Sequence, residues 1–176
     1  TADVALAIAE AYPRARVSGL DPSVRMLDIG RDKVDADALQ SRVELIEGDA
    51  QALPFKDDHF DASVISFGIR NVPDRALGLK EMARVTRPKG RVVVLELSEP
   101  PAGVMGSLAR FHVHHVVPRL GALLSGAHEY RYLQDSIEAF PPADQFVLTM
   151  EAAGLENVRV KKLAFGAAHL FVGDVA

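Results

Sequence analysis

The sequence predicts a doubly wound α/β domain whose mostly parallel sheet ends in an antiparallel hairpin. Through the first hundred residues, short apolar runs alternate with helical patterns, and this alternation implies parallel strand pairing. The continuous apolar run at Arg91–Leu97 is typical of a strand buried on both faces. Asn157–Ala164 and Ala168–Asp174 face each other across a short turn, which is the spacing of a hairpin.

The remaining elements follow from periodicity and from breaking residues. Helical spacing of apolar residues predicts helices at 2–12, 22–39, 74–86 and 144–153, with a further helix that begins near Tyr130. Pro88 and Gly90 end the third of these helices, and Gly154 ends the fourth. Short apolar runs predict strands at 16–20, 42–47 and 61–67.

Composition indicates one soluble globular domain, spanning 1–176. A chain of 176 residues can bury a sizeable core, and 48% hydrophobic with 25% charged residues is ordinary for a soluble protein. A net charge of −4 carries no electrostatic footprint for nucleic acid. The lack of cysteine excludes disulfides, thiolate metal sites and cysteine nucleophiles. No signal peptide or membrane-spanning run is visible, so we expect a cytoplasmic protein.

Polar residues follow two of the predicted strands where each one ends. The strand at 42–47 stops at Gly48, Asp49 and Ala50, and the apolar run at 62–65 stops at Ser66. Ligands of open parallel sheets bind outside the carboxyl ends of the strands, so we expect both stops at one edge. There the Asp49 carboxylate and the Ala50 N–H would offer one acceptor and one donor to an adenine ring.

Asp21 ends the predicted strand at 16–20, in the sequence Asp21-Pro22-Ser23. A carboxylate at this place can bind the two hydroxyls of a nucleoside ribose. The alternative is structural, because either Asp21 or Ser23 could cap the following helix with no ligand present.

Six segments of the chain carry a family pattern. They are DVALAIA, GLDPSVRMLDIGR, GDAQALPF, SFGIRNVPD, RVTRPKGRVVVLELSEP and HEYRYLQDSI. Together they resemble the ubiquinone/menaquinone biosynthesis C-methyltransferases, class I enzymes dependent on S-adenosylmethionine, from Thr1 to about Gly173. The family signature Arg-Val-aliphatic-Lys-Pro-Gly-Gly is altered at Thr86, Arg87 and Lys89. A Rossmann-like sheet with a final hairpin is typical of the class I methyltransferase architecture and unlike a plain dinucleotide domain.

The resemblance implies S-adenosylmethionine as the cofactor and also implies its ligands. Asp21 would bind the ribose, and the adenine edge would lie at Asp49 and Ala50. The full set that it implies is Thr1, Asp3, Asp21, Asp49, Ala50 and Ser66. The family places a strand and a glycine-rich turn before the residues that open this chain. We therefore expect the first strand to be missing and 1–3 to be the tail of that turn.

The resemblance further implies C-methylation of a polyprenyl quinol, demethylmenaquinol or a methoxy-polyprenyl-benzoquinol. A ring carbon is a poor nucleophile unless a ring hydroxyl is deprotonated, so the acceptor should be a quinol and not a quinone. Arg70 and Asn71 would face the ring. Because arginine essentially never loses its proton, we expect Arg70 to stabilise the phenolate and to order a water. The structural alternative is a salt bridge to Asp74.

The proton acceptor is not determined by the sequence. His112, His115 and Tyr130 all remain candidates. His112, His114 and His115 also suggest a metal site, but no carboxylate lies near them in the sequence, so no metal is expected.

Substrate choice is expected in a helical insertion at about 99–141. No acidic residue occurs from Pro100 to His128, a stretch that is otherwise apolar and basic. Its segment at about 102–125 could contact the inner face of an anionic membrane, or line a tunnel for a polyprenyl tail. The alternative is an ordinary core-facing helix with a break at Pro118. A homodimer is also left open.

Three other functions compete with quinol methylation. The cofactor half is shared across the class, so another small molecule could be the acceptor. A nicotinamide-dependent oxidoreductase would also use Asp21, but the terminal hairpin and GDAQALPF argue against it. The third is a truncated, non-catalytic paralogue that binds a lipid or a partner, and the missing glycine turn is its support.

Overall fold

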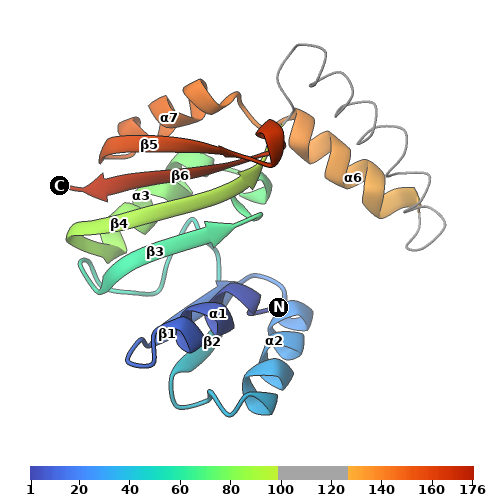
Figure 1. Ribbon diagram of the computed structural model, residues 1–176, viewed down its shortest axis with the longest axis vertical. Coiled ribbons are helices and arrows are strands. Elements are labelled where there is room, and N and C mark those ends of the chain that lie inside the picture. Colours follow the sequence, from blue (N-terminus) through green and yellow to red (C-terminus); the bar gives the residue numbers. More distant parts are fainter. Residues whose placement is uncertain (99–126) are drawn as a thin grey trace. The chain divides into compact units, whose positions relative to one another are not determined.

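The computed structural model of the chain describes residues 1–98 and 127–176, with side chains for 1–98 and 132–176. It contains two compact units, residues 1–54 and 55–176, and each unit has its own sheet (Figure 1). His112 and the segment at about 102–125 lie outside the described residues. The single domain with an insertion at about 99–141 therefore stays a prediction.

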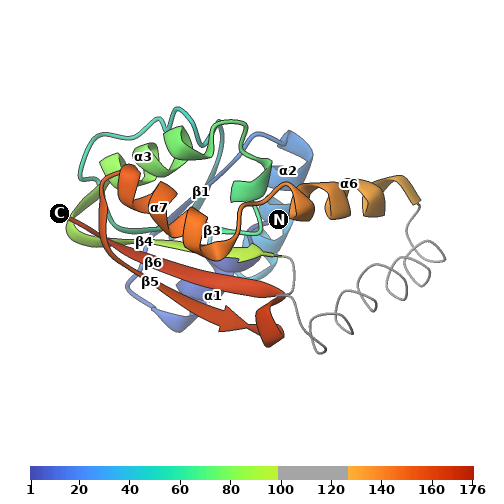
Figure 2. The same cartoon turned by 90° about the horizontal axis from the view of Figure 1, so that it is seen from above.

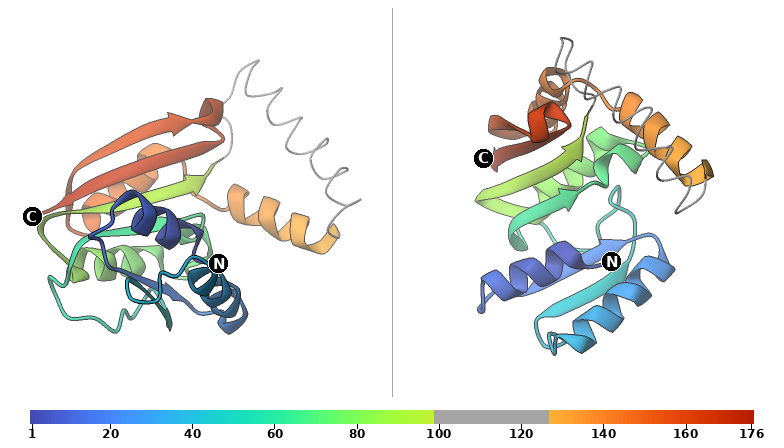
Figure 3. Two further views of the ribbon diagram at one scale, coloured as in Figure 1. Left: turned by 60° about the horizontal axis from the view of Figure 1, so that its bottom comes forward. Right: turned by 45° about the vertical axis from the view of Figure 1, so that its right-hand side comes forward.

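The first unit is built from two helices and two parallel strands. Its elements are α1 (Asp3–Ala11), β1 (Val17–Asp21), α2 (Val24–Ala36) and β2 (Val43–Glu47). The strands pair in register from Val17 opposite Val43 to Asp21 opposite Glu47, so Asp21 is the last residue of its strand. Figure 3 shows both helices alongside the two strands. The buried core is Ala5, Leu6, Ala9, Val34, Leu39 and Val43.

Helix α2 ends at Ala36, three residues before the predicted end. Ala38 adopts a left-handed φ of 54°, a conformation that stops a helix. The N–H of Leu39 then donates to the Val34 carbonyl at 2.9 Å, and the Ala38 N–H donates to that of Asp35 at 3.1 Å. This is a Schellman motif, and it returns the Leu39 side chain to the core beside Val34.

The second unit contains a four-stranded mixed sheet in the order β3-β4-β6-β5. The strands are β3 (Phe60–Ser66), β4 (Thr86–Leu97), β5 (Leu155–Leu163) and β6 (Ala168–Val175). β3 and β4 are parallel, whereas β6 is antiparallel to both β4 and β5. The predicted parallel strands and terminal antiparallel hairpin are therefore both confirmed.

The helices of this unit are α3 (Arg75–Val85), α6 (Ala127–Glu138) and α7 (Ala143–Ala152), with short 3₁₀ turns η1 (Ile69–Asn71) and η3 (Ala164–Gly166). α3 and α7 pack against each other and against the sheet (Figure 2). The largest apolar side chains that are fully buried here are Ile69, Leu79, Val85, Val92, Val94, Phe146, Met150 and Phe171. Within the described ranges, no helix has both the length and the apolar character needed to cross a membrane.

Strand β4 begins at Thr86, five residues before the predicted start at Arg91. Thr86 pairs with Phe60, and the register then shifts so that Ala62 pairs with Arg91. The residues between them form a bulge that includes Lys89 in a left-handed conformation, with φ 66°. A Cβ at Gly90 would lie 2.7 Å from both the Arg87 and Asp61 carbonyl oxygens, so only glycine fits there.

Candidate active site

Asp21 ends β1 with one carboxylate oxygen committed to the backbone. Its Oδ1 accepts the Ser23 N–H at 2.8 Å. The N-cap of α2 is Ser23, whose Oγ accepts the Met26 N–H at 3.4 Å. Of the two caps that the structural alternative allowed, Ser23 is therefore the cap and Asp21 is not. Its Oδ2 has no hydrogen-bond partner among the described residues, which leaves an acceptor for a ribose hydroxyl.

The Asp49 carboxylate, two residues after β2, is bonded to Gln51. The Gln51 backbone N–H donates to Oδ1 at 2.9 Å, and its side-chain amide donates to both oxygens, at 3.2 and 2.9 Å. The N–H of Ala50 has no partner among the described residues. The Asp49 acceptor is thus bonded to Gln51, whereas the adjacent Ala50 donor has no such partner.

Thr1 and Asp3 lie at the start of α1, where the Thr1 hydroxyl donates a hydrogen bond to Asp3 Oδ2. The other oxygen of Asp3 accepts from Lys33 Nζ at 2.7 Å. The hydrogen bonds from Lys33 and then from Thr1 lower the pKa of Asp3 to about 2. Asp3 is therefore an ionised, exposed carboxylate paired with a cation on α2.

In the second unit, β3 ends in a turn that carries Arg70. Ser66 is the last residue of the strand, and its hydroxyl has no partner in the described part of the chain. Phe67 adopts a left-handed φ of 54°, an uncommon conformation for a bulky residue. Its carbonyl accepts from Arg70 Nη1 at 2.5 Å. Ile69, the first residue of the η1 turn, is fully buried and anchors that turn in the core.

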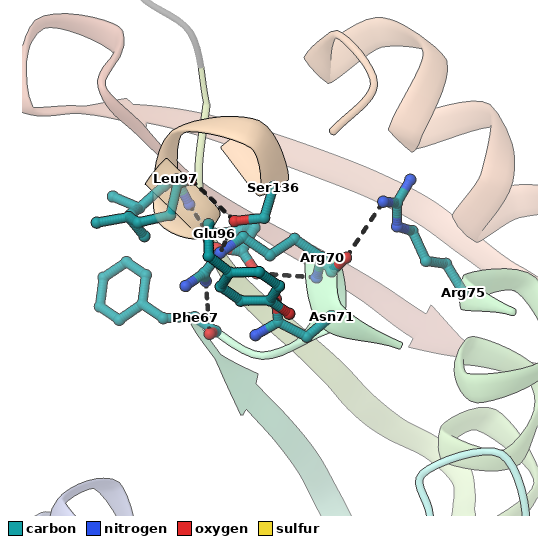
Figure 4. A network of polar contacts seen from close by, with 9 residues as sticks. Phe67, Arg70, Asn71, Arg75, Glu96, Leu97 and Ser136 are labelled. Carbon is teal, nitrogen blue, oxygen red and sulfur yellow. Dashed lines mark hydrogen bonds and ion pairs between the residues drawn. The ribbon is translucent and has the colours of Figure 1, made fainter. Parts of the chain in front are cut away.

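Arg70 forms a buried ion pair with Glu96, near the end of β4 (Figure 4). Its Nη1 lies 2.8 Å from Glu96 Oε1, and its backbone N–H donates to Glu96 Oε2 at 3.1 Å. The Arg70 side chain is 10% exposed and that of Glu96 is 0% exposed. Asp74, the alternative partner, instead caps α3 by accepting the Leu77 N–H at 2.9 Å.

One nitrogen of the Arg70 guanidinium is left for a ligand. Nε donates to Ser136 Oγ on α6 at 3.2 Å, and Nη1 donates to Phe67 and to Glu96. Nη2 has no hydrogen-bond partner among residues 1–98 and 132–176. An arginine held in this way can offer two N–H donors to a developing anion without moving.

Helix α6 also contacts Asn71, the neighbour of Arg70. The Tyr132 hydroxyl donates to Asn71 Oδ1 at 3.3 Å. Tyr132 and Ser136 are one helical turn apart and lie on the same face of α6. That face therefore contacts both Arg70 and Asn71, the residues predicted to face the acceptor ring. Tyr130 lies within α6, but its side chain is outside the described residues, as is all of His112.

A second polar pair lies at the end of β4. Ser98 Oγ is 2.6 Å from His169 Nδ1, and it donates to the Gly166 carbonyl at 3.1 Å. Because the hydroxyl has only one proton, His169 Nδ1–H is the donor to Ser98. Burial, and then the charge of Lys162, lower the pKa of His169, which favours its neutral form. Within the described ranges, no group of three acidic, histidine or cysteine side chains could hold a metal ion.

Sequence reasoning assigned no role to Glu96, Ser136 or Gln51. The signal for Glu96 was present, because an acidic residue inside the apolar strand at 91–97 must be paired if it is buried. Ser136 and Gln51 carry no comparable signal in the sequence.

The family model of the ubiE/COQ5 methyltransferase family matches residues 1–174. Ubiquinone/menaquinone biosynthesis C-methyltransferase UbiE of Syntrophotalea carbinolica is 43% identical over 173 residues, which cover 98% of this chain and 72% of that protein. Demethylmenaquinone methyltransferase of Thermus thermophilus is 46% identical over 175 residues, which cover 99% of this chain and 78% of that protein.

Solved structures show the same fold at lower identity. A SAM-dependent methyltransferase of Thermotoga maritima has a TM-score of 0.64 at 20% identity, covering 96% of this chain and 76% of that one. The [4+2]-cyclase SpnF has a TM-score of 0.69 at 20% identity, covering 94% of this chain and only 51% of that one. Because a cyclase is among them, these likenesses show the fold and not the reaction.

The family model and the two relatives confirm the predicted family, the class I methyltransferase fold and the class of activity. With them, S-adenosylmethionine is confirmed as the cofactor expected of such an enzyme. The chain belongs to the ubiE/COQ5 methyltransferase family.

Proposed function

We propose that this protein transfers a methyl group from S-adenosylmethionine to a ring carbon of a polyprenyl quinol in menaquinone or ubiquinone biosynthesis. The names of the two relatives support a quinone-pathway acceptor. The observation that carries the proposal is the buried guanidinium of Arg70, which keeps the two N–H groups of Nη2 for a ligand.

The residues of the first unit would hold the cofactor. Oδ2 of Asp21, which has no partner in the described part of the chain, suits a ribose hydroxyl, and Asp49 with the Ala50 N–H suits an adenine edge. By resemblance, Thr1 and Asp3 remain proposed cofactor contacts, as does Ser66 at the end of β3 in the second unit. Bound S-adenosylmethionine would supply an electrophilic methyl group on a sulfonium.

The residues at the end of β3 would activate the acceptor. When a quinol hydroxyl loses its proton, the oxygen becomes anionic and the ring carbon beside it becomes nucleophilic. Arg70 Nη2 would donate to that oxygen, and Asn71 would help to orient the ring. The carbon would then take the methyl group that the cofactor supplies, and it would release its own hydrogen as a proton to water. His112, His115 and Tyr130 are the proposed acceptors of the hydroxyl proton.

A peripheral membrane contact through about 102–125 would bring the protein to its lipid-tailed acceptor. The absence of acidic residues from Pro100 to His128 supports this proposal, because basic and apolar residues together favour an anionic membrane surface. A homodimer remains a prediction.

Genetic complementation tests the proposed function. The protein would be expressed in a bacterium that normally makes both quinones but lacks its own family enzyme, and its quinones would be analysed by mass spectrometry. Recovery of menaquinone alone identifies a naphthoquinol acceptor, and recovery of both quinones identifies a broader enzyme. Recovery of neither by a protein that is folded and present would contradict the proposal. Arg70→Ala, expressed at the same level, should restore neither.

A further inference from the structure

The Glu96 carboxylate accepts hydrogen bonds from both the side chain and the backbone of Arg70. Its Oε1 accepts from Arg70 Nη1 and from the Leu97 N–H, each at 2.8 Å, and its Oε2 accepts from the Arg70 N–H. A single contact would allow the guanidinium to swing about the η1 turn. Two contacts to the same residue fix the turn and the side chain relative to each other.

A carboxylate with 0% exposure is costly to keep in a core strand. Buried ion pairs are often no more stabilising than apolar residues of the same volume. Stability alone therefore does not account for an acidic residue at this position of β4. Alignment of Arg70 does account for it.

Helix α6 completes the hold on Arg70. Ser136 Oγ donates its proton to the Leu133 carbonyl at 2.9 Å, which leaves the oxygen as an acceptor for Arg70 Nε. Arg75 supports the same turn, since its Nη2 donates to the Arg70 carbonyl at 3.2 Å and its Nη1 to the Ala139 carbonyl at 3.3 Å. Nε donates to Ser136, and Nη1 donates to Phe67 and to Glu96, so among the described residues Nη2 is the one guanidinium nitrogen without a partner (Figure 4).

We propose that Glu96 and Ser136 are positioning residues that act through Arg70 and fix the direction in which Nη2 points. The inference rests on the proposed function, in which Nη2 binds the acceptor oxygen. Neither residue need touch substrate or cofactor. A displacement of about 1 Å in such a group can cost on the order of 100-fold in rate.

The kinetic test uses Glu96→Gln and Ser136→Ala in the whole protein. Glu96→Gln should lower kcat by about 10- to 100-fold, and Ser136→Ala by a smaller factor, with unchanged affinity for S-adenosylhomocysteine. Because Glu96 acts through Arg70, Glu96→Gln should cause no further loss of kcat in an Arg70→Ala background. Additive losses would overturn the proposal.

Two matched controls separate alignment from stability. Thr86→Val removes a buried polar group at the opposite end of β4, and Asp135→Asn changes the exposed neighbour of Ser136 on α6. Both should keep kcat within about twofold of the unaltered protein, after correction for the folded fraction by thermal unfolding. A loss in Thr86→Val equal to that in Glu96→Gln would assign Glu96 a structural role and overturn the proposal.

A spectroscopic measurement distinguishes failure of this inference from failure of the proposed function. The side-chain Nε–H resonance of Arg70, assigned by its loss in Arg70→Lys, should exchange slowly with water. The exchange should become faster in both Glu96→Gln and Ser136→Ala. If the exchange rate is unchanged in Glu96→Gln and Ser136→Ala, the proposed positioning of Arg70 is overturned, even if the enzyme is active. Slow exchange that is lost in both variants supports it, even if no quinol is methylated.

Discussion

Both carboxylate oxygens of Asp49 accept hydrogen bonds from the side-chain amide of Gln51. The exocyclic amino group of adenine is the same kind of donor, an sp² nitrogen with two N–H bonds. Gln51 therefore occupies the acceptor that an adenine ring would use. Cofactor binding through Asp49 would have to displace this amide.

Gln51→Leu should consequently bind S-adenosylhomocysteine more tightly. Removing the competing donor saves about 0.5–1 kcal/mol, the net value of one hydrogen bond, which corresponds to roughly two- to fivefold in affinity. Isothermal titration calorimetry measures this change. Gln40→Leu is the matched control, because Gln40 is an exposed glutamine of the same unit whose amide bonds to the Asp35 carbonyl. Weaker binding by Gln51→Leu would show that Gln51 supports the cofactor.

The proposed roles of Asp21 and Arg70 predict opposite effects on binding and turnover. Asp21→Ala should abolish measurable affinity for S-adenosylhomocysteine, and Asp21→Asn should lower it by at least about tenfold, because charge-assisted hydrogen bonds are the stronger ones. Arg70→Ala should retain that affinity and lose about 100- to 1,000-fold in kcat.

Glu47→Gln is the control for the Asp21 variants. Glu47 pairs with Asp21 at the end of β2. The substitution therefore removes a carboxylate from the same pair of strands. Its affinity should equal that of the unaltered protein. Equal loss of affinity in Asp21→Ala and Arg70→Ala would contradict the division of roles.

The core of the second unit should depend strongly on Phe146. This side chain is fully buried on α7, with its ring 4.8 Å from those of Phe140 and Phe171, measured between centroids. Phe146→Ala should lower the free energy of unfolding by about 3–5 kcal/mol. Leu148→Ala, two residues away on the same helix and 64% exposed, should change it by less than about 0.5 kcal/mol. Denaturant unfolding of both variants would detect this difference, and similar losses would contradict the packing.

Protonation of His169 should destabilise the fold in mildly acidic solution. Burial, and then Lys162, lower its pKa in the folded state below the ordinary value of 6.5. The unfolded chain then binds more protons between these two values, so the free energy of unfolding falls as the pH drops below about 6.5. The decrease levels off below the pKa of the folded state.

His169→Gln should remove this part of the pH dependence, as measured by urea unfolding at a series of pH values. His59→Gln is the control, because it replaces an exposed histidine of the same unit, and the slope due to His169 should persist in that variant. A slope that survives in His169→Gln would assign the pH dependence to another group.

The ends of the strands could be predicted from the sequence because apolar runs and polar stops are local signals. Asp21, Asp49 and Ser66 each lie at or just beyond a strand end, as predicted. The end of α2 was less predictable, because Ala38 takes the left-handed position that glycine usually marks. The apolar Leu39 extended the helical pattern past the true end.

The pairing of Arg70 with Glu96 and with Ser136 could not be predicted, because these two partners are distant from it in the sequence. Glu96 lies 26 residues away and Ser136 lies 66 residues away. Pairing of β3 with β4 and the position of α6 bring them together, and both depend on tertiary packing rather than on local pattern. The family resemblance suggests that Arg70 and Asn71 face the acceptor ring, and the structure shows which residues hold them.

The most direct test of the proposed function compares reduced and oxidised acceptors. The purified protein would be incubated anaerobically with S-adenosylmethionine labelled in its methyl group, together with demethylmenaquinol or demethylmenaquinone. The label should enter the ring of the quinol only, because the quinone has no hydroxyl to ionise. No transfer to the quinol, or equal transfer to the quinone, would contradict the proposed function.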